Sequence, residues 1–186
     1  MKKIIAFTGS NNPNSIHEKL VQYVISEFPE AKIAFVDLKD FNVPIYSQAI
    51  EKMGIPEKIK KLFQIFSEAE GFILASPEHN GLPSAFLKNI IDWLSRIDQQ
   101  FFGQKPILLL STSPGVTGGR THLQLLAGLV GRWGGYLVGQ YSLGSFFENF
   151  DEAKNEVKIP STREKLNELV WGLVTADEEE FQNGVS

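Results

Sequence analysis

Three short polar loops hold most of the side chains in this sequence that could bind a ligand. They cover residues 9–15, 76–84 and 111–119, and each directly follows a short apolar run. Glycines, small hydroxyl side chains and the free backbone N–H groups at a helix start are the groups that hold an anion such as a phosphate. The sequence therefore predicts a site built from loop backbone and small polar side chains.

Other catalytic arrangements do not fit the sequence. The chain has no cysteine, which excludes thiolate nucleophiles and cysteine-based metal sites. His17, His79 and His122 lack the spacing of metal ligands, so we expect no metal, and His122 is expected to be structural. The serine elbow G-x-S-x-G and the nucleotide loops G-x-x-x-x-G-K-[ST] and G-x-G-x-x-G are missing. Asp92 follows Lys88 by one helical turn and is expected to pair with it.

Between these loops, segments with the hydrophobic pattern of buried strands alternate with segments that have helical spacing. Apolar runs typical of buried strands occupy residues 4–7, 33–36, 72–75, 107–110 and 136–141, and helical spacing occupies 15–28, 56–68, 83–94, 121–133 and 161–174. Uninterrupted apolar strands in β-α order indicate a parallel sheet covered on both faces. We predict an α/β fold, a three-layer doubly wound five-stranded parallel sheet with the flavodoxin-like strand order 2-1-3-4-5. Its carboxyl edge would collect all three polar loops.

Length, composition and charge limit the number of domains, the partners and the cellular location that we expect. The 186 residues are 42% apolar, which predicts one globular domain over 1–176 followed by an acidic tail at 177–186. The net charge of −4 predicts no nucleic-acid partner. The apolar run near the N-terminus is shorter than a secretion signal needs, and no run is long enough to span a membrane. We therefore expect a soluble cytoplasmic protein.

Two motifs carry a family resemblance that extends from the first strand to about Phe150. The loop P-E-H-N-G at 77–81 and the segment L-K-N-I-I-D-W at 87–93 resemble the P-E-Y-N-G loop and L-K-N-x-I-D-W helix of the NADPH-dependent FMN reductase family, with His79 at the tyrosine position. Gly9, Ser10 and Ser15 match the family's phosphate loop G-S-x-R-x-x-S-x-N. The loop from Ser113 to Gly119 looks like the family segment beside the flavin ring.

The resemblance implies a flavodoxin-like enzyme that passes a hydride from NADPH or NADH through FMN to a flavin, quinone or similar small acceptor. The implied FMN-binding residues are Ser10, Asn12, Ser15, Ile16, His17, Pro77, Glu78, His79, Asn80, Gly81, Ser113, Pro114, Gly115 and Gly118. His79 is the candidate catalytic residue, as the proton donor to a quinone-like product, although a plain surface histidine would look the same. Which acceptor and which nicotinamide are used stays open, with Arg120 as one group that could meet a 2′-phosphate.

Two departures from the family pattern fall in the phosphate loop. Asn12 replaces the arginine and His17 replaces the asparagine. The arginine would make charge-assisted hydrogen bonds, which contribute roughly 1.5–3 kcal/mol each. His17 could restore part of this attraction if it were protonated. We therefore predict weaker, more exchangeable FMN binding than in a family member that keeps the arginine.

Two other functions stay open at this point. One is a flavodoxin-like FMN-binding electron carrier without direct NAD(P)H turnover, and the other is a scaffold in which the loop departures have abolished flavin binding. Separately, residues 83–94 carry more apolar surface than one sheet contact requires, so this helix either is covered within the monomer or packs on a second subunit. Because the family commonly dimerises near this helix, we expect a homodimer or a dimer of dimers through residues 83–95.

Overall fold

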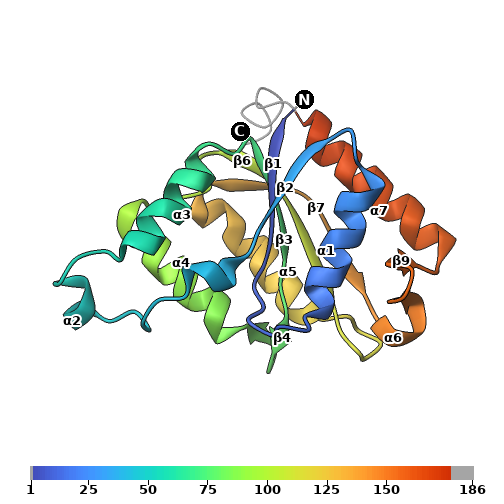
Figure 1. Cartoon of the computed structure of the whole chain (residues 1–186), viewed down its shortest axis with the longest axis horizontal. Helices are drawn as coiled ribbons and strands as arrows, with labels where there is room; N and C mark the ends of the chain where they lie inside the picture. Colours follow the sequence, from blue (N-terminus) through green and yellow to red (C-terminus); the bar gives the residue numbers. More distant parts are fainter. Residues whose placement is uncertain (1, 177–186) are drawn as a thin grey trace.

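Five parallel strands form the centre of the computed structural model, which describes residues 2–176. They are β1 (Lys3–Thr8), β2 (Lys32–Val36), β3 (Gly71–Ala75), β6 (Lys105–Thr112) and β7 (Gly135–Leu143), paired in the order β2-β1-β3-β6-β7 (Figure 1). Counting only these strands, the order is 2-1-3-4-5, so the predicted flavodoxin-like sheet is confirmed. The predicted acidic tail at 177–186 lies outside the described residues.

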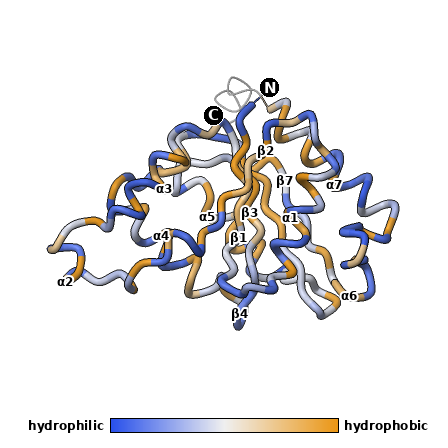
Figure 2. The backbone as a smooth tube through the Cα atoms, in the orientation of Figure 1, coloured by the Kyte–Doolittle hydropathy of each residue, from blue (hydrophilic) through white to orange (hydrophobic). Residues whose placement is uncertain are grey.

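Helices cover both faces of this sheet. The helices α1 (Ile16–Glu27) and α7 (Pro160–Thr175) pack on one face, and α3 (Glu57–Ser67), α4 (Ala85–Ile97) and α5 (Arg120–Leu129) pack on the other (Figure 1). Alternate residues of each strand enter opposite cores because side chains on a strand point to opposite faces in turn. In β1, Ile5 and Phe7 join one core while Ile4 and Ala6 join the other. Figure 2 shows the hydrophobic residues gathered along these central strands.

Several short elements were not predicted. They are η1 (Leu38–Phe41), α2 (Gln48–Glu51), η2 (Val130–Trp133), α6 (Phe146–Asn149) and two small hairpins, β4 (Glu78–His79) with β5 (Leu82–Pro83) and β8 (Phe150–Asp151) with β9 (Glu156–Val157). The helix expected at 121–133 ends as an α-helix at Leu129, and the 3-10 helix η2 follows it directly. The predicted pair of Lys88 with Asp92 is confirmed, with Nζ 2.6 Å from a carboxylate oxygen.

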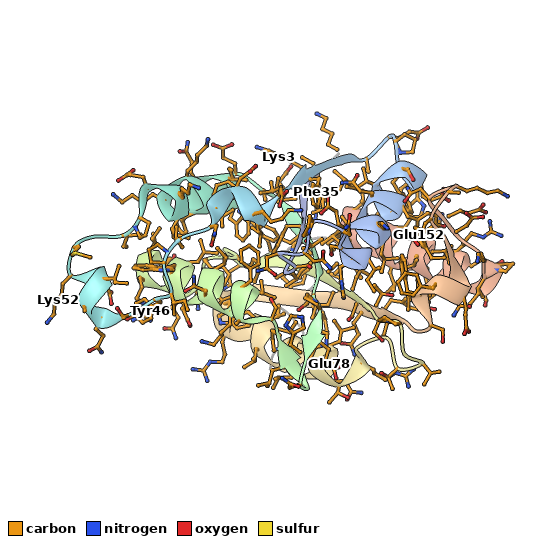
Figure 3. All side chains as sticks on the ribbon, turned by 60° about the horizontal axis from the view of Figure 1, so that its bottom comes forward. Lys3, Phe35, Tyr46, Lys52, Glu78 and Glu152 are labelled. Carbon is orange, nitrogen blue, oxygen red and sulfur yellow. The ribbon has the colours of Figure 1, made fainter. Side chains whose placement is uncertain are left out.

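The segment 38–55 runs over α4 and covers its additional apolar face within the same chain. Trp93 is fully buried, and its Nε1 donates to the carbonyl of Pro44 at 2.8 Å. The side chain of Asn89 accepts from the Tyr46 N–H at 2.8 Å and donates to the carbonyl of Val43 at 3.3 Å. The apolar excess that suggested a second subunit is therefore explained by the monomer. Figure 3 shows Tyr46 and Lys52 on this outlying segment.

No helix in the described part of the chain is both long and apolar enough to cross a membrane.

Candidate functional site

A cleft of about 490 Å³ opens at the carboxyl edge of the sheet. This volume falls in the range of roughly 300–1,000 Å³ that is usual for small-molecule sites. The segments that follow β1, β3 and β6 supply most of its wall, and α6 supplies one further residue. The lining residues are Ser10, Asn11, Asn12, Asn14, Ser15, Ile16, His17, Pro77, Glu78, His79, Thr112, Ser113, Pro114 and Phe147.

The loop before α1 is fixed at its first residue. The Gly9 N–H donates to the carbonyl of Ala75 at 2.9 Å, and the Gly9 carbonyl accepts from the Ser84 hydroxyl at 2.5 Å. A Cβ at Gly9 would lie 2.7 Å from a side-chain carbon of Leu87, so only glycine lets the loop pass this close to α4. The same Ser84 hydroxyl caps α4 by accepting from the Leu87 N–H at 3.0 Å.

Beyond Gly9, this loop is held by short local hydrogen bonds. Ser10 Oγ accepts from the Asn12 N–H at 3.2 Å, and Asn12 Oδ1 accepts from the Asn14 N–H at 2.9 Å. Ser15 is the N-cap of α1 and accepts from the Glu18 N–H at 3.3 Å. The first backbone N–H groups of a helix lack intrahelical partners, so this end of the cleft suits an anionic group.

His17 is buried at the base of the cleft, with 5% of its surface exposed. Its Nε2 accepts from the Thr112 N–H at 3.4 Å. Burial, together with the neighbouring His122 and His79, lowers the pKa of His17 from 6.5 to about 3. His17 is therefore neutral near pH 7 in the ligand-free protein, so the protonation by which it could restore part of the missing attraction is absent there. The sequence could not reveal this because burial of the ring depends on strands that are distant in the chain.

The second wall is a β-hairpin rather than a plain loop. Asn80 and Gly81 have φ values of 55° and 78° and form the two-residue turn between β4 and β5. An Asn-Gly pair favours this kind of turn because both residues tolerate positive φ. That dipeptide was the signal from which the hairpin could have been predicted.

Glu78 links this hairpin to the start of α5. Its Oε2 accepts from the His122 N–H at 3.2 Å, in the first turn of the helix. The N-cap residue of α5 is Gly119, which has no side chain to cap the helix. Glu78 therefore serves as the cap from another segment, in a position where the helix dipole favours its negative charge. Figure 3 shows Glu78 on the hairpin at this edge.

His122 is fully buried and connects the second and third loops. Its Nδ1 lies 2.6 Å from the carbonyl oxygen of Gly119 and 3.4 Å from Oε2 of Glu78. Both of these atoms are acceptors, so we assign the ring proton to Nδ1. Ser111 Oγ adds a further link by donating to the carbonyl of Ser76 at 2.9 Å.

The third loop is held against the segment that follows β7. The Phe146 N–H donates to the carbonyl of Ser113 at 3.0 Å, and the Ser145 N–H donates to that of Gly115 at 2.8 Å. Phe146 is buried, whereas Phe147 is 57% exposed and lines the cleft. The short helix α6 is thus packed against the third loop and places one aromatic ring at the cleft.

Most of the predicted site residues come together here. The cleft wall contains Ser10, Asn12, Ser15, Ile16, His17, Pro77, Glu78, His79, Ser113 and Pro114. It does not contain Asn80, Gly81, Gly115 or Gly118, which form the hairpin turn and the contacts between loops. Asn11, Asn14, Thr112 and Phe147 line the cleft without having been predicted, although the first three are next to predicted residues in the sequence.

The chemistry of this wall suits a flat, partly apolar ligand with an anionic end. Prolines 77 and 114, Ile16 and Phe147 provide apolar surface, and serine and asparagine side chains surround the start of α1. Residues 2–176 contain no group of three histidine, aspartate or glutamate side chains that could hold a metal ion. The donors and apolar side chains of this wall therefore fit FMN.

Comparison with known sequences identifies the family. A family model described as NADPH-dependent FMN reductase matches residues 2–148. The chain belongs to the NADPH-dependent FMN reductase family. It is by class an NAD(P)H-dependent oxidoreductase, and FMN is the cofactor of that class.

Individual relatives are consistent with this assignment. The chain is 31% identical to an uncharacterised Mycoplasma pneumoniae protein, over 76% of this chain and 87% of that protein. It is 29% identical to an NAD(P)H-dependent FMN reductase of Pseudomonas aeruginosa, over 61% of this chain and 60% of the reductase. An NADPH:quinone oxidoreductase of Arabidopsis thaliana is 31% identical, over 66% and 64% respectively. The electron-carrier alternative is not favoured, because these named relatives are reductases.

Solved structures confirm the fold. The flavoenzyme FerB of Paracoccus denitrificans, an NAD(P)H:acceptor oxidoreductase, superposes with a TM-score of 0.74 at 23% identity, covering 94% of this chain and 96% of FerB. The apo form of an NADH:FMN oxidoreductase gives a TM-score of 0.69 at 19% identity, covering 95% of this chain and 92% of that one. At these identities the likeness establishes the flavodoxin-like architecture.

Proposed function

We propose that this protein transfers reducing equivalents from NADPH or NADH, through FMN held in the cleft, to a small acceptor such as a quinone or a free flavin. The observation that carries the proposal is the meeting of the α1 start, the hairpin after β3 and the loop after β6 around one cleft. FMN supplies the hydride-accepting ring of this chemistry. The chain supplies binding, orientation and electrostatics.

The start of α1 would hold the phosphate. Ser10 and Ser15 can donate their hydroxyl hydrogens, and Asn12 can donate from its amide NH₂ group. The positive end of the α1 dipole adds to these neutral donors. The resulting phosphate site is uncharged apart from the dipole.

The second and third loops would form the two sides of the ring site. Pro77 and Pro114 are stiff and apolar, which suits contact with a planar ring. Backbone N–H groups of the hairpin 78–81 would stabilise the negative charge that develops on a reduced ring, as donors in an oxyanion hole do. The carboxylate of Glu78, beside them, accepts from the His122 N–H at the start of α5.

His79 would act as the proton donor to a quinone-like acceptor. It lines the cleft and is exposed, whereas His17 and His122 are buried. Only an exposed group can readily recover a proton from solvent after each turnover. His79→Ala should therefore slow quinone reduction more than it slows the preceding oxidation of NADPH.

NADPH oxidation by the FMN-loaded protein tests the proposed activity. We expect turnover with a soluble quinone or with excess FMN as the acceptor, and no reduction of the quinone by flavin-free protein. Loaded protein that is reduced by neither NADPH nor NADH, yet exchanges electrons with a protein donor, would instead support the electron carrier.

We further propose a cytoplasmic homodimer, or dimer of dimers, that associates through residues 83–95 and the segments beside them. Ile45 is 81% exposed next to the Pro44 carbonyl that Trp93 contacts, and Leu82 is 56% exposed just before α4. Trp93 itself is buried in the monomer, so Ile45→Asp is the appropriate probe of association. A monomeric sedimentation coefficient for the unmodified protein would contradict this proposal.

A further inference from the structure

Three phenylalanines follow β7, and one of them differs from the others in what its side chain contacts. Phe146 and Phe150 are buried in the core formed with α1 and α7, and their rings stack with centroids 4.7 Å apart. Phe147 is more than half exposed and lines the cleft. Among the described residues that line the cleft, it is the only phenylalanine, tyrosine or tryptophan. The cleft therefore has one aromatic hydrocarbon ring to offer a ligand.

The backbone around this ring is held at both ends of α6. Ser145, the residue before α6, has a φ of 47°, which is unfavourable for a residue with a Cβ and persists only where neighbouring contacts impose it. The Ser145 N–H donates to the carbonyl of Gly115 at 2.8 Å. Beyond the ring, Asn149 Nδ2 donates to the carbonyl of Gly144 at 2.9 Å. Strain of this kind, maintained beside a cleft, is typical of a segment that positions a functional side chain.

The Phe147 ring lies beside the third loop, which forms one proposed wall of the flavin-ring site. The Phe146 N–H donates to the carbonyl of Ser113 at 3.0 Å, and Ser113 and Pro114 line the cleft together with Phe147. The rings of Phe146 and Phe147 meet edge to face, with centroids 5.5 Å apart and planes at 88°. The buried Phe146 thus supports the exposed ring from the core side, and Phe147 can contact a ligand without leaving its place.

An aromatic ring in this position favours flat aromatic ligands over compact polar ones. Two aromatic rings attract each other when they stack with an offset or meet edge to face, in addition to the gain from the apolar area that they bury. An acceptor with two fused rings presents more of this surface than an acceptor with one ring. The Phe147 ring therefore distinguishes acceptors by the size of their aromatic system.

We infer that Phe147 determines the acceptor specificity of the cleft and that the preferred acceptor is a fused-ring quinone, a naphthoquinone rather than a benzoquinone. This inference rests on the proposed function and deepens it, since it narrows the acceptor class and adds the residue that selects it. The overall reaction balances with one hydride from NADPH and one proton, because the quinone gains two electrons and two protons and leaves as the hydroquinone.

Steady-state kinetics of the FMN-loaded protein test the inference with menadione, a methylated naphthoquinone, and toluquinone, its single-ring counterpart. The KM of the parent protein should be lower for menadione. Specificity is the ratio of kcat/KM for menadione to that for toluquinone, and comparing this ratio between variant and parent cancels the intrinsic reactivity of the two quinones. Phe147→Ala should lower the ratio by about fivefold, mainly through a higher KM for menadione.

Two further variants distinguish a specific contact from a general disturbance. Phe147→Tyr keeps the ring and should retain most of the ratio. Trp171→Ala removes another exposed aromatic side chain, which lies on α7 and does not line the cleft, so it should leave the ratio as it is. Circular dichroism of each variant would verify that it is folded.

The outcomes separate the inference from the proposed function. An unchanged ratio in Phe147→Ala, or a parent KM that is lower for toluquinone, would overturn the inference and leave the proposed function standing. A Kd for FMN that rises more than about fivefold in this variant while the ratio stays the same would also overturn it, because the ring would then contact the cofactor. Failure of the FMN-loaded parent to oxidise NADPH with either quinone or with free flavin would overturn the inference and the proposed function together.

Discussion

The two ends of the cleft are built on different principles. At the ring end, the hairpin, the end of β6 and the start of α5 are cross-linked by Glu78, His122 and the Ser111–Ser76 hydrogen bond. At the phosphate end, one loop is anchored at Gly9 and continues through local turns of serine and asparagine. The proposed ring walls are thus held by contacts between distant segments, whereas the proposed phosphate loop is held beyond Gly9 by local contacts.

The largest loss of stability should come from substituting Gly119, which lies at the start of α5. Gly119 has a φ of +78°, and a Cβ there would lie 2.4 Å from Ser111 Oγ. We expect Gly119→Ala to lower the free energy of unfolding by about 3 kcal/mol, the range for backbone strain combined with overpacking. Urea denaturation measures this change.

Gly128 provides the matched control in the same helix. A Cβ at Gly128 would meet nothing within 4 Å, so Gly128→Ala should raise the free energy of unfolding by up to about 1 kcal/mol. Equal stabilities for the two variants would show that the loops are not held together at Gly119.

A pH-dependent effect should follow from His17. The unfolded chain takes up a proton on this residue near pH 6.5, whereas the folded protein does so only near pH 3. Stability from the neutral ring is thus fully present above pH 6.5 and declines as the pH falls toward 3. Between pH 6.5 and 5 we expect a loss of about 2 kcal/mol in unfolding free energy, since one pKa unit corresponds to about 1.4 kcal/mol.

Urea denaturation at several pH values, compared with His17→Gln, isolates this contribution. The variant has no titratable ring, so its free energy of unfolding should fall less steeply with decreasing pH. If the slope were the same in both proteins, His17 would have to be ionisable in the folded state, and the phosphate end would be able to carry a positive charge.

A smaller effect is expected at the helix cap. Glu78→Ala removes the acceptor of the His122 N–H, and losing an N-cap typically lowers stability by about 1 kcal/mol. Glu78→Gln keeps an acceptor oxygen and should retain most of that stability. Thermal unfolding of the two variants would distinguish them. A Glu78→Ala protein as stable as the parent would show that Glu78 does not stabilise the contact between the hairpin and α5.

The main elements could be predicted from the sequence because each has a clear period. Strand β3 is a continuous apolar run and α1 has helical spacing, and such patterns indicate the β-α alternation of a parallel sheet. The small hairpins and the segment over α4 could not be found in this way, since turn chemistry and tertiary contacts determine them. Glu78 and His122 are 44 residues apart, so their contact has no local sequence signal.

The site was predicted best in the segment that follows β1, whose five predicted residues all line the cleft. Pro77, Glu78 and His79 were expected at the cleft and line it. The protonation state of His17 could not be settled from the sequence, because burial, not residue type, lowers its pKa. Phe147 differs from its buried neighbours Phe146 and Phe150 only in which way it faces, and nothing in a run of aromatic residues specifies that.

An anaerobic absorbance spectrum, recorded before and after adding FMN and then NADPH, tests the central claim most directly. Added FMN should bind, with perturbed flavin bands, and those bands should bleach when NADPH is added. Bands that stay oxidised with both NADPH and NADH, or a protein that retains no flavin at any concentration, would contradict it.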